Sequence, residues 1–144
     1  MAQLRSIKSD IEIKLIQKAI DITEKAFRRV MRFVKPGVME NEIEAEIIHE
    51  FIRKRATGHA YSPIIASGAN ACVLHYIDNN QQCKAGDVIL LDFGAEYANY
   101  AADLTRCVPV SGEFTDRQRD VYNAVLRVMR QATKMLVPGN TIEK

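Results

Sequence analysis

The chain contains three stretches in which apolar residues recur every three to four positions, the spacing of one face of an α-helix. Helix signals bound the first of them, because Ser9 and Glu12 form a capping box at its start and Pro36-Gly37 follows its end. Pro138-Gly139 closes the third stretch in the same way. The pattern predicts helices over residues 9–34, 40–55 and 116–136.

Between the second and third of these helices, short apolar runs alternate with turn residues, which is typical of strands. The pattern predicts strands over residues 61–66, 88–93 and 100–110. If Ala98-Asn99 forms a two-residue loop, the last two strands make a hairpin. Long helices beside such strands indicate an α+β fold with an antiparallel-rich sheet.

The two Pro-Gly pairs also suggest an internal repeat. When the chain is slid so that the pairs coincide, apolar residues of the first helix superpose on apolar residues of the third. We expect a first repeat over about residues 9–110 and the start of a second over residues 111–144.

Length and charge restrict the class of protein. A chain of 144 residues can form one domain with a real core, and its net charge is only +2. No overall field attracts nucleic acid or an anionic membrane, and no apolar run is long enough to span a bilayer. We therefore expect neither nucleic acid nor a membrane as a partner.

The cysteines indicate the compartment. Cys72, Cys83 and Cys107 form no CxxC pair and leave an odd count, which suits free thiols in a reducing environment. We expect a cytoplasmic protein in which all three are structural.

Two aspartates are the main candidates for chemistry. Asp92 closes the apolar run of the second strand, and Asp103 lies in the third. In a hairpin with its loop at residues 98–99, Asp92 opposes Thr105, so Asp103 and Asp92 lie on one face as diagonal neighbours, about 7 to 8 Å apart at the backbone. Two anions so close repel, and divalent cations are a natural remedy.

A structural interpretation of the same residues stays open on spacing alone, and spacing alone favours it. Asp92 would then end the strand, and Asp103 would pair with a basic residue such as Arg106.

The combined motifs resemble a known family. The segments YSPIIASGANACVLHY and GDVILLDFGAEYANYAADLTR carry Leu74-His75-Tyr76, Asp92-x-Gly94 and Asp103-x-Thr105-Arg106 in this order. They resemble the pita-bread metallopeptidases, the superfamily of methionine aminopeptidase, prolidase and aminopeptidase P. The likeness is nearest to the bacterial aminopeptidase P (Xaa-Pro aminopeptidase) group and runs through almost the whole chain. It implies the first half of a pita-bread fold and favours the metal interpretation.

The resemblance implies roles for individual residues. Asp92 would hold one metal ion and Asp103 would bridge two divalent ions, with Mn²⁺ expected first and Co²⁺, Zn²⁺ or Fe²⁺ as alternatives. His75 would be catalytic, lining the substrate pocket. Tyr61 and Thr105 would support the metal-bound carboxylates, although Tyr61 fits a core aromatic equally well.

The resemblance also implies a reaction, the release of the first residue from peptides with proline at position two. The family site needs one more histidine and two glutamates, which we expect beyond Lys144, so the chain resembles half of a catalytic domain and is expected to be inactive alone. A homo-oligomer is expected. The alternatives are a metal-free pita-bread domain that binds peptides and a creatinase-like hydrolase.

Overall fold

The computed structural model describes residues 5–141. The chain divides into two compact units, Met1–Gly112 and Glu113–Lys144. The internal repeat stays a prediction.

Two long helices of the first unit bear out the apolar periodicity. They are α2 (Asp10–Phe33) and α3 (Glu40–Arg53), which begin and end within one or two residues of the predicted bounds. Their buried faces share one core, to which α2 contributes Ile22, Ala26 and Val30. Ile47 and Phe51 of α3 are buried in the same cluster.

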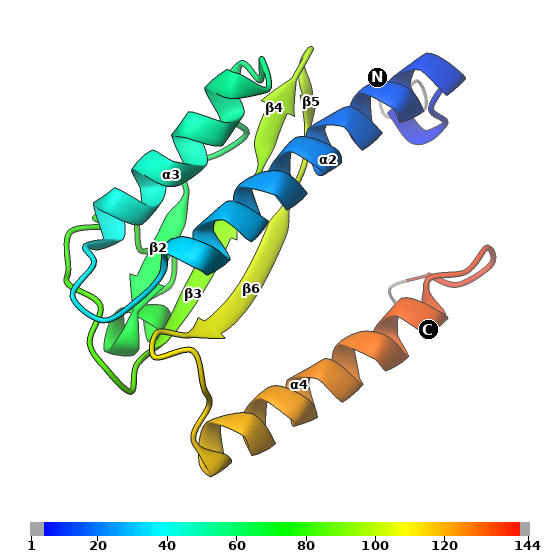
Figure 1. The fold of residues 1–144 in the computed structure, drawn as a ribbon. Coiled ribbons are helices and arrows are strands. Elements are labelled where there is room, and N and C mark those ends of the chain that lie inside the picture. Colours follow the sequence, from blue (N-terminus) through cyan, green and yellow to red (C-terminus); the bar gives the residue numbers. More distant parts are fainter. Residues whose placement is uncertain (1–4, 142–144) are drawn as a thin grey trace. The chain divides into compact units, whose positions relative to one another are not determined.

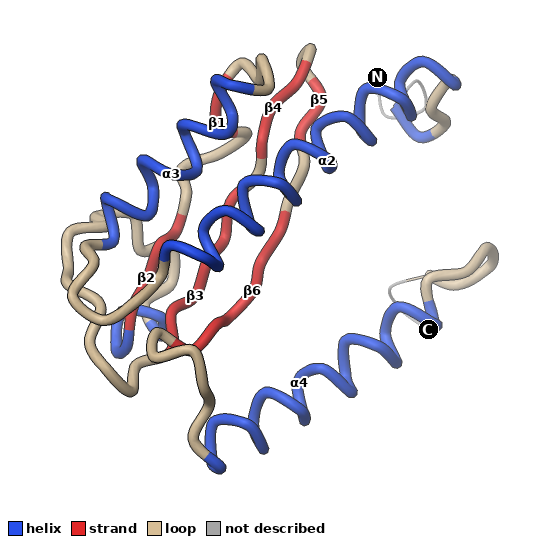
Figure 2. Tube along the Cα trace, viewed as in Figure 1, coloured by secondary structure: helices blue, strands red, loops and turns tan. Residues whose placement is uncertain are grey.

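Within residues 5–141, six strands, most of which Figure 1 labels, form two antiparallel sheets. One sheet has the order β2 (Ile64–Ser67), β3 (Val88–Phe93) and β6 (Leu104–Pro109). The other has the order β1 (Gly58–His59), β4 (Ala95–Tyr97) and β5 (Tyr100–Ala101). Both α2 and α3 lie on the same side of the strands (Figure 2).

The alternation along β3 assigns a role to each face of its sheet. Ile89, Leu91 and Phe93 are fully buried in the core with the helices. The residues between them are only partly buried, and these include Leu90 and Asp92. Since successive side chains of a strand point to opposite faces, Asp92 lies on the face that the two helices do not cover.

Two predicted strands have wrong bounds. The strand predicted over residues 61–66 begins at Ile64, because Pro63 has no N–H to donate to a ladder, and Tyr61 therefore lies in the loop before it. The strand predicted over residues 100–110 is broken at residues 102–103 into β5 and β6. Strands β1 and β4 were not predicted.

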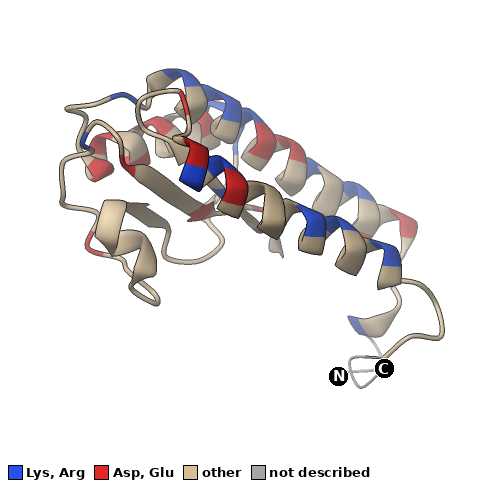
Figure 3. Ribbon diagram, turned by 90° about the horizontal axis from the view of Figure 1, so that it is seen from below, with Lys and Arg blue, Asp and Glu red and all other residues tan. Residues whose placement is uncertain are grey.

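The second unit consists mainly of α4 (Asp116–Met135), near the predicted bounds. Thr115 begins it, and its side chain accepts a hydrogen bond from the Gln118 N–H. Acidic and basic residues are interspersed along the helices of the molecule (Figure 3). No helix within residues 5–141 is long and apolar enough to cross a membrane.

Candidate metal centre

The hairpin between β3 and β6 has the predicted register. Ala98 and Asn99 occupy its tip with φ values of 51° and 66°, the left-handed pair that a two-residue type I′ loop requires. Asp92 opposes Thr105, and Tyr97 opposes Tyr100. The loop position and the pairing of Asp92 with Thr105 are therefore confirmed.

A close approach of the two arms breaks the hairpin beside the aspartates. A Cβ added to Gly94 would lie 1.8 Å from the carbonyl oxygen of Ala102, so no side chain fits there. The Gly94 carbonyl instead accepts the Ala60 N–H, and the Ala102 N–H donates to the Ala95 carbonyl. We call this close approach of Gly94 and Ala102 the crossing. Asp92 and Asp103 lie on either side of it.

The Tyr61 hydroxyl joins the two carboxylates. It donates to Asp92 Oδ1 at 2.7 Å and lies 3.1 Å from Asp103 Oδ1. A hydroxyl carries one proton, so Asp103 Oδ1 can accept only a share of the proton that Tyr61 donates to Asp92. The side chains of Asp92, which is half-buried, and Asp103, which is exposed, therefore converge on one point.

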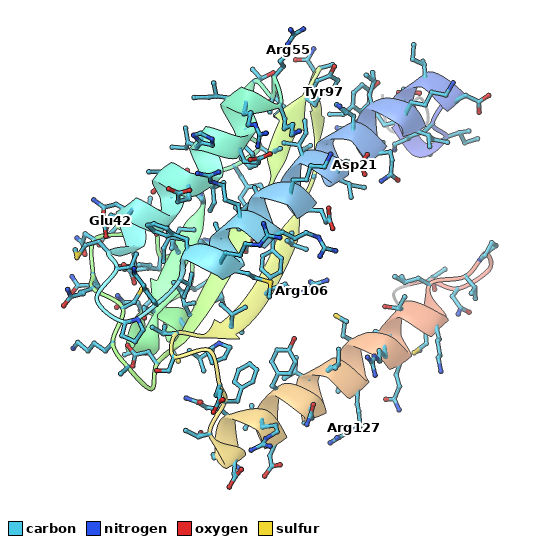
Figure 4. The ribbon with its side chains drawn as sticks, viewed as in Figure 1. Asp21, Glu42, Arg55, Tyr97, Arg106 and Arg127 are labelled. Carbon is cyan, nitrogen blue, oxygen red and sulfur yellow. The ribbon has the colours of Figure 1, made fainter. Side chains whose placement is uncertain are left out.

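Ion pairs are the next feature of the two carboxylates. Among residues 5–141, no ion pair involves Asp92 or Asp103. Arg106, the candidate partner of Asp103, instead donates to the Thr105 carbonyl at 2.7 Å, and its side chain extends away from β6 (Figure 4). The interpretation in which Arg106 pairs with Asp103 is therefore wrong.

The electrostatics fit a hard divalent cation. Burial, and then the two carboxylates, raise the pKa of Tyr61 well above its usual range, so the phenol remains a neutral donor. Converging carboxylate oxygens without a countercharge suit Mn²⁺ or Mg²⁺. Residues 5–141 contain no group of three potential metal ligands, so a complete coordination sphere needs further donors.

The other predicted site residues are placed less closely. Thr105 is exposed and directly across the ladder from Asp92. His75 is exposed in the segment after the 3₁₀ turn Gly68–Cys72, and no hydrogen bond among the described residues links it to either aspartate. Its φ of 54° is left-handed, which is uncommon for a non-glycine residue. Its role stays a prediction.

Glu40 is a residue of this region that sequence reasoning missed. This carboxylate is completely buried and accepts hydrogen bonds from both ends of the segment that carries His75. An acidic residue in the first turn of a helix is ordinary, since it complements the helix dipole, so only the structure singles it out.

The chain is similar to known proteins along nearly its full length. It is 43% identical over 144 residues to a Xaa-Pro aminopeptidase of Haemophilus influenzae, covering 100% of this chain. It is 41% identical over 140 residues to that of Escherichia coli, covering 97%. The chain spans about a third of the length of these relatives, 34% and 32% respectively.

Solved structures give the same likeness. A putative aminopeptidase P from Bacillus anthracis superposes with a TM-score of 0.95 at 38% identity, over 98% of this chain and 34% of that one. Zn-substituted Escherichia coli aminopeptidase P in complex with product gives 0.94 at 41% identity, over 96% and 32%. The fold is therefore α+β with the architecture of the corresponding third of aminopeptidase P, and the predicted fold class is confirmed.

A family model described as metallopeptidase family M24 matches residues 14–144. The chain belongs to metallopeptidase family M24.

Proposed function

We propose that the complete protein containing this chain is a metal-dependent aminopeptidase that removes the first residue from peptides with proline at position two. The observation that carries the proposal is the convergence of Asp92 and Asp103 on the Tyr61 hydroxyl, where neither carboxylate forms an ion pair with a residue in the described part of the chain. Membership of family M24 and about 40% identity to Xaa-Pro aminopeptidases support the same activity.

The proposal assigns a role to each candidate site residue. Asp92 and Asp103 would bind two divalent cations, with Asp103 shared between them, and Tyr61 would hold Asp92 in place through its hydrogen bond. Thr105, across the ladder from Asp92, would support the same carboxylate from the neighbouring strand. When bound, such a metal pair acidifies a water molecule and stabilises negative charge on the scissile carbonyl oxygen.

His75 would act on the substrate rather than on the metal. Its exposed imidazole can hydrogen-bond the scissile peptide group and stabilise charge that develops there. A proline at position two makes the scissile bond a tertiary amide without an N–H, so the carbonyl oxygen is the atom of that bond that can accept a hydrogen bond.

Three finer features belong to the same proposal. Mn²⁺ is the proposed metal, because oxygen ligands favour hard cations, and Co²⁺, Zn²⁺ and Fe²⁺ are the alternatives if a histidine completes the site. The protein would act in the cytoplasm, in keeping with its free cysteines. It would work as a homo-oligomer.

The second candidate function is a metal-free module that binds peptides on the same scaffold. The two converging carboxylates disfavour it, because a binder gains nothing from two crowded anions that lack a countercharge. A creatinase-like hydrolase is a third candidate, which substrate assays distinguish.

The test uses Asp92→Asn and Asp103→Asn in the complete protein. We expect each variant to lose metal and to cleave a Xaa-Pro peptide at least about a hundredfold more slowly, because an amide is a weaker ligand without charge. Elemental analysis and a peptide assay measure the two effects, and Asp21→Asn is the control because Asp21 is an exposed carboxylate on α2. Full activity in Asp103→Asn would contradict the metal-bridging role.

A further inference from the structure

The segment that carries His75, residues 68–80, follows the end of β2 at Ser67 and is followed by Gln81. Beyond its first turn it contains almost no regular structure. Its exposed side chains include Val73, Leu74 and Ile77, which are 53%, 86% and 57% exposed. Such a segment holds one conformation only if specific contacts anchor it.

Two buried side chains supply anchors: Asn79, which bonds to the Ile65 N–H, the Pro63 carbonyl and Glu44, and Glu40, whose bonds lie on either side of His75. Glu40 is 0% exposed, and its Oε1 accepts the Ser67 N–H at 2.8 Å and lies 3.4 Å from Asn70 Nδ2. Its Oε2 accepts the Tyr76 O–H at 2.7 Å and the Gln81 N–H at 2.9 Å. Two of the four donors belong to the residues that flank the segment, Ser67 and Gln81, and two belong to the segment itself, Asn70 and Tyr76.

The charge of Glu40 is balanced by these donors and by its position. Among the described residues it forms no ion pair, and it is the first residue of α3, where the helix dipole stabilises an anion. A buried carboxylate is costly unless it is hydrogen-bonded in this way. The segment and Glu40 therefore stabilise each other.

The middle anchor lies directly beside His75. Tyr76 is 8% exposed, and burial together with its bond to Glu40 raises the pKa of Tyr76 to about 12, so it remains a donor at neutral pH. His75 itself has the disfavoured left-handed backbone conformation. An unanchored segment would relax out of that conformation and move the imidazole.

We propose that Glu40 is a positioning residue, whose carboxylate fixes the backbone of residues 68–80 and thereby the place of the His75 imidazole beside the substrate. The proposal rests on the proposed aminopeptidase function. It assigns Glu40 no contact with metal or substrate, so its loss acts through His75.

The test compares Glu40→Gln, Tyr76→Phe and Glu42→Gln in the complete protein. Gln at position 40 keeps one acceptor oxygen, but its NH₂ group would face groups that are themselves donors. Phe at position 76 removes only the hydrogen bond from Tyr76 to Glu40. Glu42→Gln is the matched control, because Glu42 lies in the same helical turn and accepts the Met39 N–H, but bonds to no residue of the segment.

We expect Glu40→Gln to lower kcat about tenfold to a hundredfold while KM and the metal content change little. Tyr76→Phe should give a smaller loss, and Glu42→Gln none. Hydrogen exchange at the Ser67 and Gln81 amides should be faster in Glu40→Gln than in Glu42→Gln. Combining Glu40→Gln with His75→Ala should cost no more than His75→Ala alone, which a merely structural role would not give.

Equal kcat in Glu40→Gln and Glu42→Gln, or a loss of metal in proportion to the loss of rate, would overturn the proposal. If Glu40→Gln does not fold, an unchanged kcat in Tyr76→Phe overturns it equally. The unaltered complete protein separates the two proposals. If it shows no metal-dependent cleavage, the proposed function is refuted. If it cleaves normally and Glu40→Gln has the same kcat, only the positioning role is refuted.

Discussion

At the scale of single residues, His59 stands out because its two ring nitrogens are buried. Neither nitrogen has a hydrogen-bond partner among the described residues, and the ring packs against Phe51 with centroids 5.1 Å apart. Burial lowers the pKa of His59, and the opposing effect of Glu44 is smaller. The folded protein therefore resists protonation of this imidazole more than the unfolded chain does.

The lowered pKa predicts a loss of stability in mild acid. The unfolded chain takes up a proton near the ordinary value of 6.5, whereas the folded chain does so only at lower pH. The stability from keeping His59 neutral is thus present above that value and lost as pH falls. Urea unfolding between about pH 7 and about pH 5 should show a smaller decline in His59→Phe than in the parent.

The matched control is His49→Gln, since His49 is exposed on the neighbouring helix. We expect it to keep the pH dependence of the parent. An identical decline in His59→Phe would show that other groups cause it.

The site residues differ in how well the sequence predicts them. Asp92 and Asp103 could be brought together because alternation and loop length fix the register of a hairpin. The joint contact of Tyr61 with both aspartates depends on the loop before β2, and Glu40 depends on a segment that folds back over α3. Contacts between distant segments leave no local periodicity, so spacing alone could not indicate them.

At the scale of elements, the crossing at Gly94 controls the geometry of the site. Outside the left-handed region, replacing glycine by alanine normally stabilises a chain slightly, because it reduces the entropy of the unfolded state. Here the added methyl group would lie 1.8 Å from the Ala102 carbonyl oxygen and 2.6 Å from its carbon. Backbone atoms cannot rotate away, so the two arms of the hairpin must separate.

We therefore predict that Gly94→Ala lowers the free energy of unfolding by roughly 3 kcal/mol or more, at or above the upper end of ordinary overpacking. It should also weaken metal binding in the complete protein, because Asp92 and Asp103 flank the crossing. Urea unfolding measures the first effect and titration with Mn²⁺ the second. Ala101→Ser, on an exposed position of the same hairpin, is the control, and parent-like stability in Gly94→Ala would show that the arms tolerate separation.

The elements differ in whether the sequence alone predicts them. Helices α2, α3 and α4 and strand β3 follow from strong local patterns. The break between β5 and β6 follows instead from the close approach at Gly94. Strand β1 has two residues, which is too short for any alternation to indicate it.

At the scale of the whole molecule, α4 carries apolar residues at helical spacing, among them Val121, Val125 and Val128, and its own unit leaves these three uncovered. The apolar stripe of a helix is normally packed against another element. We therefore expect the isolated chain to self-associate, a tendency that light scattering measures.

The small number of possible metal ligands in the chain leads us to predict that its 144 residues alone have no aminopeptidase activity. Asp92 and Asp103 are the only converging carboxylates proposed as ligands, and residues 5–141 hold no group of three. Two carboxylates can bind one cation weakly, with water in the other coordination positions. A second cation nearby would be repelled unless further anions offset the charge. Dimerisation would not help, because the second copy repeats the same two ligands.

The measurement is an incubation of the purified chain with Mn²⁺ and a Xaa-Pro peptide, beside the complete protein under the same conditions. We expect weak binding of Mn²⁺ to the chain, reduced by Asp92→Asn, and no release of the first residue of the peptide. Two firmly held cations would supply the acidification of the attacking water and the stabilisation of charge on the carbonyl, and Asp92 and Asp103 alone would not hold them. Metal-dependent cleavage by the chain, abolished in Asp92→Asn, would show instead that two carboxylates, a histidine and a tyrosine suffice for the reaction.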